Sequence, residues 1–189
     1  MNKACFLDRD GVLIEEMDYL SDPAKAILIN GAADAIKRLH ENGFKVIVVS
    51  NQSGIARGYF STETLSLINK RIEELLAGSG AAVDAWYHCP HHPKGKVAEY
   101  SMECSCRKPE PGMLLKAAGE HNIDISKSAM IGDKTSDLEA GFAAGCPVGI
   151  LVATGYGQEG IPDSMPEKAV YKKDILDAAE YVIEALGNE

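Results

Sequence analysis

Three aspartates, Asp8, Asp10 and Asp133, each follow a short apolar segment and could form one acidic cluster. An acidic pair such as Asp8 and Asp10 is by itself typical of a turn or a helix N-cap. If Asp133 approaches the same point, the three carboxylates repel one another unless a cation neutralises them. A hard divalent ion with oxygen ligands, most simply Mg²⁺, would remove that conflict and leave a position for a phosphate oxygen.

The same residue types are suited to phosphoryl transfer. A carboxylate can attack phosphorus and form an aspartyl-phosphate. Asp8 and Asp10 face the same side of an extended segment, so one can attack while the other passes a proton to the leaving oxygen. The charge that develops on the phosphoryl oxygens needs donors and cations around it. The Ser50 hydroxyl, the Asn51 backbone and the Lys108 ammonium could supply them.

A second group of residues has the composition of a zinc site. A C-x-H pair and a C-x-C pair, twelve residues apart, contain Cys89, His91, Cys104 and Cys106, with His92 as a rival for the histidine. Three thiolates and one imidazole form a closed tetrahedral set, which indicates a structural rather than a catalytic ion. Scattered buried cysteines are the plainer alternative. The spacing favours a zinc-binding loop over residues 89–106.

Short apolar runs alternate with helical patterns along the chain. The expected strands cover residues 3–8, 44–50, 83–89, 128–133 and 147–153, and the expected helices cover 31–43, 61–78, 111–122, 135–145 and 174–187. This alternation predicts an α/β fold, a Rossmann-like doubly wound parallel sheet.

Ligands of such sheets bind outside the carboxyl ends of the strands. Asp8 and Asp10 follow the first expected strand, residues 50–52 end the second, and Asp133 and Lys134 follow the fourth. We therefore expect these side chains to meet at one rim. The glycine-rich run 154–160 also lies near a strand end, where a surface connection is commoner than a phosphate cradle.

Length and charge exclude several classes of protein. A chain of 189 residues with 46% hydrophobic and 25% charged residues is expected to form one domain, residues 1–189. The net charge of −9 argues against nucleic acid as the main partner. No segment is apolar enough to span a membrane, and the N-terminus turns acidic too early for a secretory signal. We expect a cytoplasmic monomer.

Four motifs, "FLDRDGV", "SNQ", "RKP" and "GDKTSD", resemble those of the haloacid dehalogenase (HAD) superfamily of phosphohydrolases, in the expected order. The longer stretches "SNQSGIARGYF", "CPHHP" and "CSCRKPEPGM" are similar to the D-glycero-D-manno-heptose 1,7-bisphosphate 7-phosphatase family. This resemblance implies hydrolysis of the 7-phosphate to give heptose 1-phosphate, during synthesis of nucleotide-activated heptose for lipopolysaccharide and other cell-surface glycans.

The resemblance also implies roles for individual residues. Asp8 would be the nucleophile, and Asp10 the general acid and then the general base. Asp8, the Asp10 carbonyl and Asp133 would bind Mg²⁺. Ser50 and Lys108 would steady the phosphoryl group.

The remaining roles concern the substrate and the zinc. Arg107 would recognise the substrate, and the substrate site would also include Glu16, Met17, Asp18, Tyr19, Ser50, Asn51, Gln52, Ser53, Lys108 and Lys134. The family pattern selects His91 over His92 as the zinc ligand. Asp137 would brace Asp133 or Lys108, or would act only as an acidic charge at a helix N-terminus.

Many members of the superfamily carry a separate cap domain, and here there is no room for one. Residues 11–50 hold a flap, a helix and a strand, and residues 51–108 hold a helix, a strand and the zinc loop. Loops must then screen the site from water, and the zinc loop is the longest candidate.

Two alternative functions stay open on the sequence. Histidinol-phosphate phosphatases share these motifs, but Arg57 and Arg107 suit a second anionic phosphate better than a cationic imidazole. A zinc-stabilised binding module without catalysis would leave Asp8, Asp10 and Asp133 unexplained.

Overall fold

Strand β1 (Lys3–Leu7) is buried on both of its faces. Cys5 and Leu7 belong to one hydrophobic core, whereas Ala4 and Phe6 belong to another. Because successive side chains of a strand point to opposite faces, a strand between two cores reads as a continuous apolar run. The run at the start of the chain therefore marks the centre of a sheet covered on both sides.

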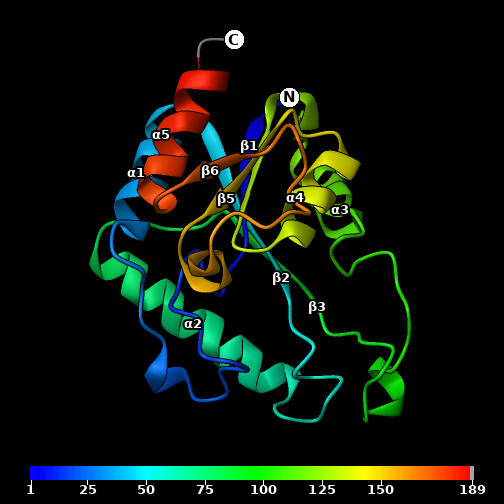
Figure 1. Ribbon diagram of the computed structural model, residues 1–189. Coiled ribbons are helices and arrows are strands. Elements are labelled where there is room, and N and C mark those ends of the chain that lie inside the picture. Colours follow the sequence, from blue (N-terminus) through cyan, green and yellow to red (C-terminus); the bar gives the residue numbers. More distant parts are fainter. Residues whose placement is uncertain (188–189) are drawn as a thin grey trace.

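The computed structural model describes residues 1–187, and within them six parallel strands form one sheet in the order β3-β2-β1-β4-β5-β6 (Figure 1). The strands after β1 are β2 (Phe44–Asn51), β3 (Ala85–Cys89), β4 (Ala129–Gly132), β5 (Val148–Val152) and β6 (Val170–Lys172). The doubly wound parallel sheet predicted from the sequence is confirmed.

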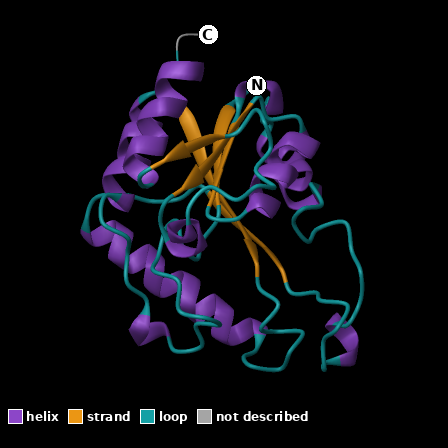
Figure 2. Cartoon of the chain, in the orientation of Figure 1, coloured by secondary structure: helices purple, strands orange, loops and turns teal. Residues whose placement is uncertain are grey.

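Helices cover both faces of this sheet (Figure 2). One core is shared with α1 (Ala32–Glu41), α2 (Thr62–Gly78) and α5 (Ile175–Leu186), and the other with α3 (Gly112–His121) and α4 (Thr135–Ala144). None of the helices within residues 1–187 has both the length and the hydropathy of a membrane span.

The helix ends follow local sequence signals. The Ser61 hydroxyl accepts a hydrogen bond from the Thr64 amide at 3.2 Å and caps the N-terminus of α2. At the other end of a helix, Gly145 follows α4 with a φ of 107°, a left-handed conformation that glycine adopts without strain.

Strand β6 was not predicted from the sequence. It has only three residues, lies at the sheet edge beside β5 and is half-buried throughout, so its hydrophobic pattern is too short to be distinctive. Short 3₁₀ turns, including Pro23–Lys25 and Ala98–Tyr100, interrupt the long connections. The described part of the chain contains no separate cap domain, in agreement with the expectation.

Candidate active site

Asp8 and Asp133 meet where the strand order of the sheet reverses. Asp8 directly follows β1, Asp133 directly follows β4, and these two strands are neighbours. The Asp8 amide donates a hydrogen bond to the Ile131 carbonyl at 3.0 Å, which continues the strand pairing into the site. Reversal points of open α/β sheets are the usual ligand sites of such folds.

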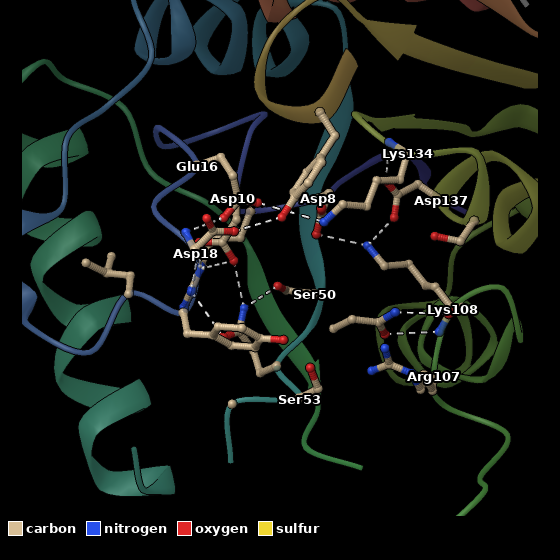
Figure 3. Close-up of a pocket in the computed structure, with 18 of the residues that line it drawn as sticks. Asp8, Asp10, Glu16, Asp18, Ser50, Ser53, Arg107, Lys108, Lys134 and Asp137 are labelled. Carbon is tan, nitrogen blue, oxygen red and sulfur yellow. Dashed lines mark hydrogen bonds and ion pairs between the residues drawn. The ribbon is translucent and has the colours of Figure 1, made fainter. Parts of the chain in front are cut away.

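Lys108 is a buried cation between two carboxylates. Its Nζ lies 2.9 Å from Asp8 Oδ1 and 2.7 Å from Asp137 Oδ1 (Figure 3). The same Nζ donates to the Val49 carbonyl at 2.7 Å. Burial alone would lower the pKa of Lys108, but the Asp137 and Asp8 carboxylates outweigh it and raise the pKa above its ordinary value. The ammonium is therefore charged and fixed beside Asp8.

Asp137 carries out both of the roles that the sequence left open. One oxygen pairs with Lys108, as above, and Oδ2 accepts a hydrogen bond from the Lys134 amide at 3.0 Å, at the N-terminus of α4. The side chain is almost fully buried. It thus both braces the lysine and caps the helix.

The acidic cluster contains more negative charge than its lysine can neutralise. Oxygens of Asp8, Asp133 and Asp137 lie within 4.8 Å of one another. Burial, and then repulsion from Asp8 and Asp137, raises the pKa of Asp133 to about 8. Burial likewise raises the pKa of Asp8 to about 6, although Lys108 opposes the shift.

One oxygen of this cluster is unpartnered. Asp133 Oδ1 is buried and accepts no hydrogen bond from any residue of the described chain. A buried carboxylate oxygen without a donor is costly unless a cation meets it. Oxygen ligands, excess negative charge and this orphaned atom together fit a divalent ion such as Mg²⁺.

The glycine-rich run 154–160 closes over the other oxygen of Asp133. The Tyr156 amide donates to Asp133 Oδ2 at 2.9 Å. A Cβ on Gly11 or Gly155 would lie 2.2 or 2.3 Å from that same oxygen, so only glycine permits the approach. The run is therefore a wall of the site rather than a surface connection.

The Asp10 carboxylate lies in a hydrogen-bond network with Arg9, Gln52 and Ser50. The carboxylate accepts from Arg9 Nη2 at 2.9 Å and from Gln52 Nε2 at 2.8 Å. Gln52 Nε2 also donates to Ser50 Oγ at 2.6 Å, which leaves the Ser50 hydroxyl hydrogen available to a ligand. Arg9 lies within the motif FLDRDGV, but no role was predicted for it.

A cleft of about 510 Å³ opens above these residues. Most of the predicted site lines it, namely Asp8, Asp10, Glu16, Asp18, Tyr19, Ser50, Asn51, Gln52, Ser53, Arg107, Lys108 and Lys134. Met17 does not; its side chain packs against the hydrophobic core, and its place in the substrate site stays a prediction. A flexible apolar side chain in a polar loop turns inward because burial removes it from water.

The Asn51 side chain makes a contact that was not predicted from the sequence. Its Nδ2 donates to the Lys108 carbonyl and its Oδ1 accepts from the Lys108 amide, both at 3.0 Å. The side-chain amide is thus used to hold the Lys108 backbone against the end of β2. Its backbone remains the part of Asn51 that could serve a ligand.

The rim of the cleft carries charges of both signs. Lys134 Nζ lies 3.8 Å from Glu16 Oε2 and 3.9 Å from the centre of the Tyr156 ring. The Tyr156 hydroxyl donates to Asp18 Oδ1 at 2.9 Å. These contacts join the loop after β1 to the glycine-rich wall. Arg57 also lines the cleft, and its Nε is buried and unpaired among the described residues.

The four expected zinc ligands converge at the start and end of their loop. The sulfurs of Cys104 and Cys106 are 3.3 Å apart, Cys89 lies 3.5 Å from Cys104, and His91 Nδ1 lies 3.5 Å from Cys106. Two sulfurs on a zinc tetrahedron with bonds of about 2.3 Å would lie ~3.8 Å apart, so the set fits a single ion. His92 instead contacts Arg57 at 3.2 Å.

Several similar proteins are known by sequence. A family described as HAD-hydrolase-like matches residues 105–179. A D-glycero-beta-D-manno-heptose-1,7-bisphosphate 7-phosphatase of Haemophilus influenzae is 43% identical over 180 residues, 93% of this chain and 97% of that protein. A protein of the same name from Yersinia pestis is 46% identical to this chain, and the match covers 80% of this chain and 81% of that protein. A Photorhabdus laumondii relative, named for the alpha anomer, is 37% identical and covers 95% and 96%.

A solved structure is similar over the whole length. It is the crystal structure of a D,D-heptose 1,7-bisphosphate phosphatase from B. bronchiseptica, complexed with magnesium and phosphate. The two chains are 36% identical with a TM-score of 0.83, and the match covers 97% of this chain and 99% of that one.

Proposed function

The chain belongs to the HAD-like family of heptose-1,7-bisphosphate 7-phosphatases, and on that premise we propose that it hydrolyses the 7-phosphate of a D-glycero-D-manno-heptose 1,7-bisphosphate. The proposal rests on one observation: Asp8, Lys108 and Asp133 are buried together where the strand order of the sheet reverses. A carboxylate held by a fixed ammonium, beside a second carboxylate with a free oxygen, is the arrangement that phosphoryl transfer through an aspartate requires.

The first half of the reaction forms an aspartyl-phosphate on Asp8. One oxygen of Asp8 is held by Lys108, and the other attacks phosphorus. The bond from phosphorus to the C7 oxygen breaks, and the leaving oxygen takes the proton of the Asp10 carboxyl to become the free alcohol. The Ser50 hydroxyl and the Lys108 ammonium bind the phosphoryl oxygens during transfer.

The second half regenerates the enzyme. Asp10, now a carboxylate, takes a proton from a water molecule whose oxygen attacks phosphorus. The bond from phosphorus to Asp8 breaks, which returns the Asp8 carboxylate and releases inorganic phosphate. Mg²⁺, held by Asp8, the Asp10 carbonyl and Asp133, would neutralise the carboxylates and the phosphoryl oxygens.

The second phosphate of the substrate would bind at the rim formed by Arg57 and Arg107. Both guanidinium groups line the cleft, and Arg57 has a buried Nε without a partner in the described chain. Guanidinium groups bind phosphate in a bidentate manner. This rim is what would distinguish a sugar bisphosphate from histidinol phosphate, whose distal group is a cationic imidazole.

We expect an Arg57→Met variant to lose its preference for the bisphosphate. Loss of a hydrogen bond to a charged group should raise the KM for heptose 1,7-bisphosphate roughly 10-fold or more, whereas the KM for heptose 7-phosphate should change little. Steady-state phosphate release with both substrates measures this. Equal effects on the two substrates would place the second phosphate elsewhere.

The cysteine and histidine cluster would hold a structural Zn²⁺. Four protein ligands complete its coordination, so the ion itself would take no part in bond breaking. The His91 carbonyl accepts a hydrogen bond from Arg107 Nη1 at 3.2 Å, and Cys106 directly precedes Arg107. The ion would thereby fix Arg107 and, next to it, Lys108.

A Cys104→Ser variant should lose its zinc and most of its activity. Without the ion the loop loosens and Arg107 and Lys108 lose their fixed positions, so we expect kcat/KM to fall by roughly 10- to 100-fold. Metal analysis and kinetics of the purified variant test this, with Ser105→Ala, an exposed neighbour, as the matched control. Complete zinc loss with unchanged kinetics would separate the loop from the active site.

The proposed function itself is tested by a substrate panel. Phosphate release should depend on Mg²⁺ and should be fastest with one anomer of heptose 1,7-bisphosphate, since relatives are named for both anomers. Histidinol phosphate should be a poor substrate. Preference for histidinol phosphate would favour that alternative, which the names of the relatives above do not support. No Mg²⁺-dependent release from any of these esters would favour the non-catalytic module.

A further inference from the structure

Arg9 lies between the two aspartates of the site and is buried to 2% exposure. No step of the proposed reaction uses its charge. A buried arginine has to be held by acceptors, and the identity of those acceptors indicates what it does. Here they are the proposed acid–base residue and the side chains around it.

We propose that Arg9 is the positioning residue for proton transfer by Asp10, an inference that rests on the proposed function. Arg9 Nε lies 3.2 Å from Asp10 Oδ1 and 3.1 Å from Oδ2, and Arg9 Nη2 lies 2.9 Å from Oδ1. Contact with both oxygens fixes the plane of the carboxyl group as well as its distance. Rotation about its Cβ–Cγ bond would break these contacts.

Arg9 is in turn held by two elements of the fold. Its Nη1 donates to Asn69 Oδ1 of α2 at 3.2 Å, and its Nη2 donates to Gln52 Oε1 at 3.2 Å. The planar guanidinium therefore has partners on both sides and cannot turn as a lysine could. The second contact also fixes the Gln52 amide so that its nitrogen faces Asp10 and Ser50.

The arrangement has a chemical consequence. Asp10 must give its proton to the C7 oxygen in the first step and take one from water in the second, so its carboxyl has to be aimed at the same point twice. Small displacements of a catalytic group reduce the rate sharply. Arg9 orients the Asp10 carboxyl through its contacts with both carboxyl oxygens, and Asn69 links α2 to the site through Arg9.

The test is a double-mutant cycle with heptose 1,7-bisphosphate as the substrate. If Arg9 acts through Asp10, Arg9→Met alone should lower kcat roughly 30- to 100-fold, up to the lower end of the 10²–10⁴-fold contribution of acid–base catalysis, with little change in KM. In an Asp10→Asn background the same substitution should cost less than about 3-fold, because coupled residues are not additive. Arg9→Lys, which keeps the charge but not the bidentate contact, should recover only part of kcat.

Controls separate positioning from folding. Arg71→Met removes an exposed arginine of α2 that pairs with Glu74, and it should leave kcat unchanged. Asn69→Leu removes only the support from α2 and should lower kcat in the same direction by a smaller factor, which keeps the proposal testable if Arg9→Met does not fold. Additive losses in the cycle would overturn the proposal. An unchanged kcat in both single variants, Asn69→Leu and Arg9→Lys, would also overturn it. If the wild-type chain releases no phosphate, the proposed function fails instead.

Discussion

An Asp8→Asn variant is expected to have no measurable turnover of heptose 1,7-bisphosphate. The carboxamide keeps the shape of the side chain but cannot attack phosphorus, so we expect kcat to fall by at least ~10⁴-fold, the scale found when a covalent nucleophile is removed. Phosphate release and trapping of a phosphorylated enzyme measure both steps. Neither should be detectable in the variant.

The variant should fold, which makes the result interpretable. Lys108 keeps its contacts with Asp137 and with the Val49 carbonyl, each at 2.7 Å, when Asp8 loses its charge. Burial already raises the pKa of Asp8, so a neutral side chain suits the site. Asp34→Asn, at an exposed position of α1, is the matched control. Turnover by Asp8→Asn near the level of that control would exclude Asp8 as the nucleophile.

The sheet could be predicted from the sequence because its central strands are buried on both faces. Such strands give continuous apolar runs, and the residues that follow them mark one edge of the sheet. β6 lacked this signal because an edge strand of three half-buried residues needs no such run. A continuous apolar run indicates that a strand is buried, so it cannot reveal a strand that is only slightly buried.

The candidate site was predictable where residue type and strand ends coincide, as for Asp8 and Asp133. Lys108 could be named only as a candidate cation, because nothing in its local sequence shows that it reaches Asp8, which lies 100 residues away. Arg9 was missed since a buried arginine looks like any charged residue in a turn. The sequence did not show that the Met17 side chain packs against the core, because the direction of a loop side chain depends on packing that the sequence does not display.

The position of Lys108 shows how the metal loop and the catalytic residues depend on each other. Its backbone is held by Asn51 at the end of β2, and the preceding Arg107 is held by the carbonyl of His91. The described chain has no cap domain that could hold the substrate. The backbone at Arg107 and Lys108 must then be kept rigid by the end of β2 on one side and by the proposed zinc ion on the other.

The acidic cluster makes the stability of the metal-free protein depend on pH in an unusual direction. The pKa of Asp8 is raised to about 6 and that of Asp133 to about 8, whereas unfolded aspartates titrate near ~4. The folded state therefore holds more protons than the unfolded state between these values. Under linkage, stability is full below about pH 4 for these two groups and falls as the pH rises toward 8.

An Asp133→Asn variant should remove the contribution of Asp133 to this pH dependence and, with it, the response to Mg²⁺. In the wild-type protein, the melting temperature without metal should fall from pH 5 to pH 8, and Mg²⁺ should restore most of the loss at pH 8 but little at pH 5, because binding requires the ionised carboxylates. The variant without metal should be more stable than wild type at pH 8, since a neutral amide relieves the repulsion from Asp8 and Asp137. Mg²⁺ should leave its melting temperature unchanged, and kcat should fall by at least ~10²-fold because a ligand of the charge-neutralising ion is lost.

Thermal unfolding with and without Mg²⁺, with Asp34→Asn as the control, measures the effects on stability, and phosphate release measures kcat. An Mg²⁺ response that persists in Asp133→Asn would place the ion elsewhere, because Asp133 Oδ1 is the acceptor in this cluster that the described chain leaves unpaired.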